Sequence, residues 1–145
     1  MRIFLLTICI IVSGTAISVA QAPQKINYQG IARNVTGQPI PNQNLGIRIS
    51  IHDLTPTGSV VYQETQSPQT NGYGLYNLAI GTGIPIIGNL ADVNWSSGNK
   101  FIQIELDPSG GNNYSDIGTS QLLSVPYSLY SEKANPTLLY TLDGF

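Results

Sequence analysis

Apolar and polar residues alternate along three stretches of the chain. In residues 45–52 (LGIRISIH) every second residue is apolar, and the same period returns in residues 74–81 (GLYNLAIG) and 100–107 (KFIQIELD). A period of two is typical of a β-strand that buries one face and exposes the other to solvent. We therefore predict three half-buried strands. The predicted core consists of Ile47, Ile49, Ile51, Val61, Leu78, Ile80, Ile102, Ile104, Leu106 and Trp95.

Three further stretches have strand composition with a weaker alternation. Residues 59–66 (SVVYQETQ) are β-branched and aromatic, and residues 25–34 (KINYQGIARN) and 120–125 (SQLLSV) are also of strand length. Turn signals rich in Gly, Pro and Asn separate these stretches. Strands spaced by turns predict an all-β sandwich of about six to eight strands. A short helix over Tyr127–Ala134 is also predicted, because Pro126 suits a first helical turn.

Two segments resemble hairpins of known sandwiches. Residues 70–80 (TNGYGLYNLAI) and 35–49 (VTGQPIPNQNLGIRI) are similar in pattern to the transthyretin-like and carboxypeptidase-regulatory-like domains. This resemblance implies an immunoglobulin-like topology.

The N-terminus has the organisation of a secretory signal peptide. Met1-Arg2 is a minimal basic start, residues 3–12 are almost entirely apolar, and Ser18-Val19-Ala20 offers small residues for cleavage. The apolar run is too short to span a bilayer, which needs about 20 residues. We predict removal of residues 1–20, a sandwich domain over 21–134 and a C-terminal tail over 135–145. The mature protein is then secreted or on the cell surface.

Composition narrows the set of partners. Charged residues make up 10% of the chain, against about 25% in typical domains. Six basic and eight acidic residues give a net charge of −2, so no basic patch is available for nucleic acid. The sequence also has no basic amphipathic helix of the kind that binds a membrane surface, so we predict no membrane partner. The only cysteine, Cys9, lies in the predicted signal peptide, so the mature chain has no disulfide.

The candidates for catalysis and metal binding are few. His52 is the only histidine, beside Asp53, and we interpret it as an exposed residue at a strand end. Glu64, Glu105 and Asp107 are assigned to solvated strand faces. The chain is therefore predicted not to be an enzyme and to need no cofactor. The one metal candidate is calcium in the loop DPSGGNNYSD, where Asp107, Asn112, Asn113 and Asp116 offer oxygen ligands. The alternative is a Gly-rich loop whose side chains bond their own backbone.

Aromatic residues suggest a second type of site. Trp95, Tyr73 and Tyr114 could contact a glycan or a peptide if they are exposed, because aromatic rings stack on such ligands. A single tryptophan in a small sandwich more often fills the core, and we place Trp95 there.

The chain resembles a recurrent N-terminal domain of secreted proteins from Bacteroidota. The resemblance runs from about Gln21 to Ala134, and it depends on QAPQKINYQGIARN, TGSVVYQETQ, TNGYGLYNLAIGTG, NWSSGNKFIQIELDPSGG and, most distinctively, GTSQLLSVPYSLYSEKA. In that family the domain usually precedes collagen-like or tail-fibre-like extensions.

The resemblance implies a structural head domain of a surface or extracellular fibre-type protein. Its C-terminal segment would contact sister chains or other surface proteins. We expect the tail here to be a junction to an extension that this chain lacks. The alternative function is a small glycan- or peptide-binding module.

Overall fold

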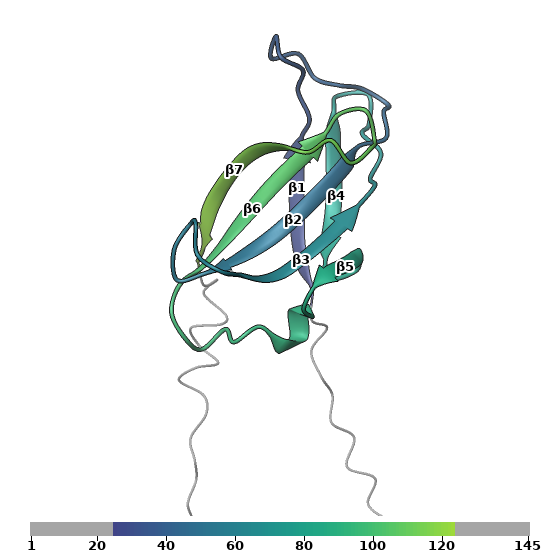
Figure 1. Ribbon diagram of the computed structural model, residues 1–145. Helices are drawn as coiled ribbons and strands as arrows, with labels where there is room; N and C mark the ends of the chain where they lie inside the picture. The colour runs from purple at the N-terminus through teal and green to yellow at the C-terminus, as the bar shows by residue number, and fades with distance from the viewer. Residues whose placement is uncertain (1–24, 124–145) are drawn as a thin grey trace, which may run out of the picture.

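A computed structural model describes residues 25–123, which form seven β-strands and one short 3-10 helix (Figure 1). The predicted signal peptide, the predicted helix at Tyr127–Ala134 and the tail lie outside these residues. In chain order the elements are β1 (Ile26–Ile31), β2 (Gly46–Asp53), β3 (Val60–Gln66), β4 (Leu75–Ile80), β5 (Ile84–Ile87), η1 (Leu90–Asp92), β6 (Lys100–Asp107) and β7 (Ser115–Leu122).

The strands form two antiparallel sheets that lie face to face. The large sheet has the order β5-β3-β2-β6-β7, and the small sheet consists of β1 and β4. The chain starts in the small sheet, enters the large sheet for β2 and β3, and returns for β4 before β5 joins the edge beside β3. The prediction of an all-β sandwich with six to eight strands is confirmed.

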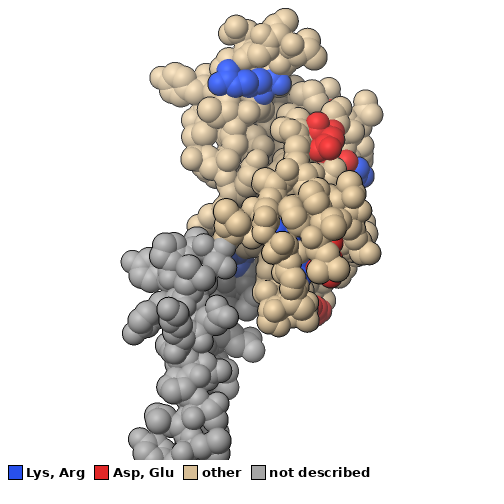
Figure 2. Space-filling view, turned by 90° about the vertical axis from the view of Figure 1, so that its left-hand side faces the viewer, with Lys and Arg blue, Asp and Glu red and all other residues tan. Residues whose placement is uncertain are grey.

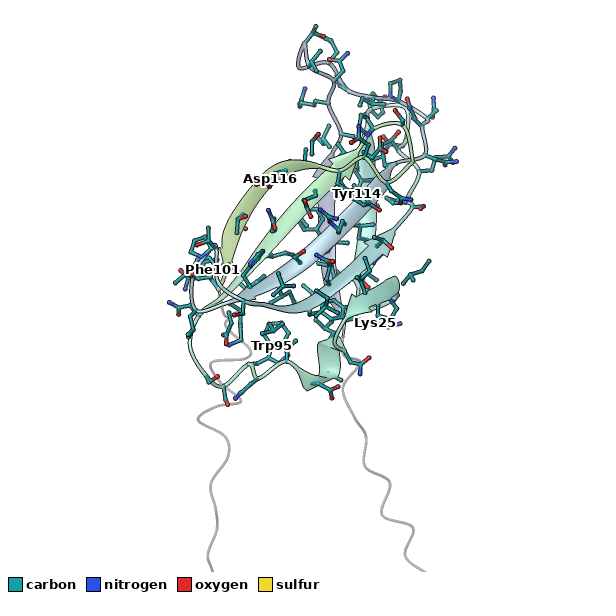
Figure 3. The ribbon with its side chains drawn as sticks, in the orientation of Figure 1. Lys25, Trp95, Phe101, Tyr114 and Asp116 are labelled. Atoms are coloured by element: carbon teal, nitrogen blue, oxygen red, sulfur yellow. The ribbon has the colours of Figure 1, made fainter. Side chains whose placement is uncertain are left out.

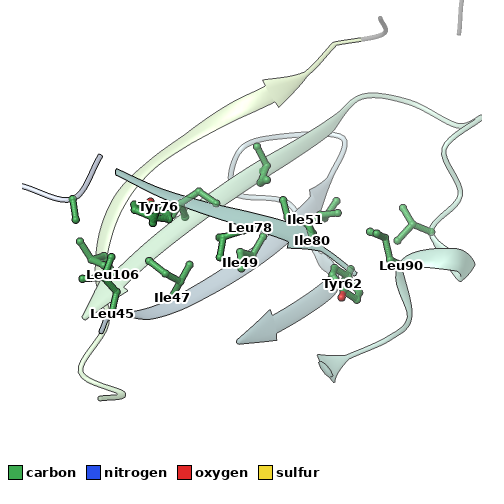
Figure 4. Close-up of a cluster of buried hydrophobic side chains, with 14 residues drawn as sticks. Leu45, Ile47, Ile49, Ile51, Tyr62, Tyr76, Leu78, Ile80, Leu90 and Leu106 are labelled. Carbon is green, nitrogen blue, oxygen red and sulfur yellow. The ribbon is translucent and has the colours of Figure 1, made fainter. Parts of the chain in front are cut away.

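Strand register places the predicted apolar residues on one face. In the β2–β6 pair, Ile49 lies opposite Ile104, and Ile51 lies opposite Ile102. Because side chains alternate across a strand, these residues all point toward the small sheet. From the other side, Tyr76, Leu78 and Ile80 of β4 are buried against them. Figure 4 shows this cluster between the two layers.

Two positions of the predicted core differ in the structure. Trp95 is 42% exposed in the loop before β6, so its assignment to the core is wrong. Leu90, the first residue of η1, and Val93, directly after η1, are buried at this end of the sandwich instead. Val61 is half-buried and contacts the core from its edge, beside the β-bulge in the β2–β3 pair.

Strand β5 and the start of β7 were not predicted. All four residues of β5 are exposed, so the segment IPII has no alternation to mark it as a strand. Strand β7 begins at Ser115, five residues before the predicted stretch, because its bulge opposite Ile104 and Glu105 interrupts the period of two.

We predict that Ile49→Asp unfolds the domain. Ile49 is fully buried, and an unpaired carboxylate buried there costs several kcal/mol, comparable to the whole stability of a small domain. The matched control is Ile86→Asp on β5, where the side chain is exposed. Circular dichroism during urea unfolding should show a cooperative transition for the control only. A cooperative transition of Ile49→Asp at the wild-type midpoint would contradict the assigned register.

Candidate functional site

The most elaborate polar site is built around the buried carboxylate of Glu64. Its side chain is 0% exposed and lies on the inner face of β3, where it accepts hydrogen bonds from four donor groups. The Tyr62 hydroxyl donates to Oε2 at 2.8 Å, and Gln66 Nε2 donates to Oε1 at 2.8 Å. The backbone N–H of Gly83 donates to Oε2 at 2.8 Å, and that of Gly81 reaches both oxygens at 3.1 and 3.2 Å.

The turn between β4 and β5 explains why glycines meet this carboxylate. Gly81 has a φ of +96°, which favours glycine, and a Cβ on Gly83 would lie 2.5 Å from the Thr65 carbonyl oxygen and 2.8 Å from Glu64 Oε2. The turn therefore lies close against β3 and directs two N–H groups at Glu64. Burial and the hydrogen bond to Glu64 raise the pKa of Tyr62, which keeps its hydroxyl a donor.

Glu64 therefore serves as a structural anchor. Its acceptor positions are used by groups of β3 and of the β4–β5 turn, so it fixes the place where the chain crosses from the small sheet to the large one. Its side chain is 0% exposed, and its hydrogen-bond partners all belong to this chain. The assignment of Glu64 to a solvated face is wrong, because the inner face of β3 carries Tyr62, Glu64 and Gln66 in place of aliphatic residues.

The outer face of the large sheet carries an ion pair beside an aromatic ring. Arg48 of β2 lies opposite Glu105 of β6, and Nε and Nη2 donate to the two carboxylate oxygens at 2.6 and 2.5 Å. The guanidinium carbon lies 4.7 Å from the centre of the Tyr114 ring. Hydrogen bonding to Glu105 raises the pKa of Arg48 above its ordinary value. These contacts neutralise the two charges at the centre of the face.

His52 belongs to a polar network on the same outer face. Its Nδ1 lies 2.8 Å from the Gly58 carbonyl oxygen, and its Nε2 lies 2.9 Å from Gln103 Oε1. The ring is half-buried, so its description as an exposed strand-end residue is wrong. Asp53 does not orient this ring; Asp53 Oδ1 lies 2.8 Å from the ammonium group of Lys100, which is itself buried.

The predicted calcium loop uses its oxygens internally. Asp107 is buried at the end of β6, and its carboxylate accepts the backbone N–H groups of Ser109 and Asn113 at 2.9 Å each. These two bonds lower the pKa of Asp107. Asn112 Oδ1 accepts from the Tyr114 hydroxyl, and Asp116 Oδ1 accepts from the N–H of Gly118.

The Asp107 and Asp116 contacts are those of a Gly-rich loop whose side chains bond their own backbone, and the Asn112 contact is with another side chain. Asp107 was assigned to a solvated face, and its burial contradicts that assignment. Across residues 25–123, no group of three or more His, Cys, Asp or Glu side chains is placed to hold a metal ion.

The three candidate contact aromatics do not share a surface. Trp95 precedes the first residue of β6 and Tyr114 follows its last, so about 26 Å of strand separates their positions along the sheet. Figure 3 shows these two side chains at opposite ends of the large sheet. Tyr73 is 81% exposed and lies in the turn after β3. Strands β3 and β6 are both antiparallel to β2, so they run in the same direction and end on the same side of the sheet, the side of Tyr114.

An apolar surface lies at the edge of the large sheet. Ile84, Ile86 and Ile87 of β5 are 73%, 54% and 41% exposed. Strand β5 is hydrogen-bonded only to β3, so its other edge has no partner strand within residues 25–123. Within the same residues, no helix is long and apolar enough to cross a membrane.

Comparison with protein families assigns the sandwich to one of them. Residues 27–122 match a family described as a domain of unknown function, DUF8740. The chain belongs to the DUF8740 family. The matched residues run from the second residue of β1 to the last of β7, so the DUF8740 domain coincides with the sandwich. No curated protein and no solved structure matches the chain.

The sequence analysis of this DUF8740 domain missed two features. The β5 surface has no periodic signal, since all its residues are exposed. The Glu64 anchor has an indirect signal in the sequence, the turn Gly81-Thr82-Gly83, whose glycines allow the backbone to lie close against β3 and to direct its N–H groups there.

We predict that Glu64→Gln lowers the free energy of unfolding by about 1–3 kcal/mol, because the new amide NH2 group faces donors and leaves some of them unsatisfied. The control is Glu105→Gln, which removes a partly exposed ion pair worth less than about 1 kcal/mol. Urea unfolding of both variants measures the difference. A larger loss for Glu105→Gln would contradict the role assigned to Glu64.

Proposed function

We propose that this DUF8740 domain is an exported, non-enzymatic structural module, the head domain of a surface or extracellular fibre-type protein. Its partners are sister chains or other surface proteins. The observation that carries the proposal is the uncovered apolar edge strand β5, with Ile84, Ile86 and Ile87 exposed.

An exposed edge strand is a surface for association. Soluble proteins usually protect such edges with charged residues, because the free backbone groups pair with other strands. Strand β5 carries no charged residue, and its three exposed isoleucines gain free energy when a partner covers them. Pro85 removes one backbone donor, which favours association through side chains over extension of the sheet.

Export is supported by the sequence of residues 1–20 and by the resemblance to secreted proteins of Bacteroidota. The domain carries few charged residues, and the two at the centre of its outer sheet face are paired with each other.

We also propose that the sandwich is immunoglobulin-like. The supporting observations are the antiparallel pairing of all strands and the repeated crossing of the chain between the sheets, from β1 to β2 and from β3 to β4. Such crossings are typical of Greek-key sandwiches.

The alternative, a glycan- or peptide-binding module, gains less support. Its three aromatic residues lie at two ends of the molecule, and one face of the Tyr114 ring is covered by Arg48. A stacking platform needs exposed rings on one surface.

We expect the mature protein, starting at Gln21 when recovered from outside the cell, to self-associate through β5. Multi-angle light scattering should show a mass that rises with concentration. Ile86→Lys should weaken this association at least about tenfold, which corresponds to 1.4 kcal/mol. Val35→Lys is the control, because Val35 is a fully exposed loop residue away from β5.

Two results would contradict the proposal. One is wild-type protein that remains monomeric at every concentration measured. The other is an Ile86→Lys variant that associates as strongly as the wild type.

A further inference from the structure

The two sheets differ in width, and this leaves part of the large sheet uncovered. Strand β1 pairs only with β4, so one edge of β1 has no partner strand within residues 25–123. Gln66 on β3 bonds the Ala79 carbonyl oxygen, which places β4 over the β3 side of the large sheet. The free edge of β1 therefore faces the β6–β7 side, where the described residues add no further strand to the small sheet (Figure 1).

A groove of about 220 Å³ lies along this free edge. Ile102 and Ile104 of β6 form its floor, Tyr28 of β1 forms one wall, and Ile117 of β7 forms the other. Gly118 and Ser120 line the β7 side, and a Cβ placed on Gly118 would meet nothing within 4 Å. The inner face of β7 therefore leaves space that a larger side chain would fill.

The chemistry of the groove suits an extended apolar segment. Its volume is below the range of about 300–1,000 Å³ that is usual for small-molecule pockets. None of its lining residues is charged, and Figure 2, which views the molecule from the β7 side, shows mainly uncharged surface there. In an antiparallel pair, alternate residues direct their N–H and C=O groups away from the partner, so the free edge of β1 offers a row of hydrogen-bonding groups. When an extended peptide adds a strand to a sheet, it uses both a free backbone edge for hydrogen bonds and an apolar groove for its alternate side chains.

The sequence after β7 contains a segment with the matching pattern. In residues 137–142 (TLLYTL), Leu138, Tyr140 and Leu142 alternate with Thr137, Leu139 and Thr141. The segment contains no charged residue, and one of its two faces is entirely apolar while the other carries Leu139 between two threonines, a pattern that predicts a strand. We propose that residues 137–142 of the same chain bind in the groove, add to the free edge of β1 and direct Leu138, Tyr140 and Leu142 at Ile102 and Ile104.

The chain is long enough for this return. Residues 124–136 span up to about 43 Å when extended, and β7 is about 26 Å long. A tethered segment has an effective concentration on the millimolar scale, which favours insertion into its own groove over a neighbour's at lower protein concentrations. The inference does not depend on the proposed association through β5.

Hydrogen exchange in the full mature chain tests the proposal with Leu138→Lys and its neighbour Leu139→Lys. The two substitutions are chemically identical, but only position 138 faces the groove. In the wild type, alternate amides of β1 that β4 leaves unpaired should be protected at least about tenfold beyond exposed loop amides. Leu138→Lys should abolish this protection, and Leu139→Lys should keep it. The protection should not change when the protein is diluted.

Three results would overturn the proposal. Unprotected free-edge amides in the wild type would mean that the groove is empty. Equal protection in both variants would mean that position 138 does not face it. Protection that falls on dilution would assign the groove to a second copy. None of these results depends on Ile86, so a failure here is distinguishable from a failure of association through β5.

Discussion

The structure depends on burying one apolar face of β2 and β6 beneath a second layer to which the described residues contribute two strands. Ile47, Ile49 and Ile51 are fully buried, and each contributes about 1.5–3 kcal/mol relative to an exposed side chain. A domain without disulfides in its described residues depends on this burial for its stability. Because the covering sheet is narrow, the large sheet is fully covered only at its centre, and both of its edge strands are largely exposed.

The polar groups of the molecule follow from the same constraint. The chain must cross between layers to build both of them, and the crossing from β4 to β5 directs the backbone N–H groups of Gly81 and Gly83 at β3. At the β4–β5 crossing the Glu64 carboxylate accepts such N–H groups. The Asp107 carboxylate accepts the N–H groups of a different kind of connection, the loop that joins the neighbouring strands β6 and β7 within the large sheet. Both acidic residues therefore act as backbone acceptors, which is a structural role.

The sequence predicted those parts of the fold where one face of a strand is apolar and the other is polar. Strands β2, β4 and β6 have this pattern, and Ile49 and Leu78 lie where the alternation placed them. Strand β5 has no buried face, and β3 buries Tyr62 and Glu64, so hydrophobic periodicity cannot describe either. Trp95 was misplaced because the size of a tryptophan says nothing of whether its loop turns toward the core. Glu64 was misplaced because backbone N–H groups that bond its carboxylate come from a turn 17 to 19 residues further along the chain.

The proposed function and the inferred groove are both consequences of incomplete cover. An edge strand with exposed isoleucines and an inner face with an open groove are surfaces on which free energy remains to be gained by association.

The most direct test of the central claim is native-state hydrogen exchange of the central strands of the large sheet. The account predicts that the amides of Ile49 and Ile104 exchange only through global unfolding, with a free energy equal to that from urea denaturation, while hydrogen-bonded amides of β5 exchange through local opening. Exchange of Ile49 and Ile104 at the rate of β5 would contradict it.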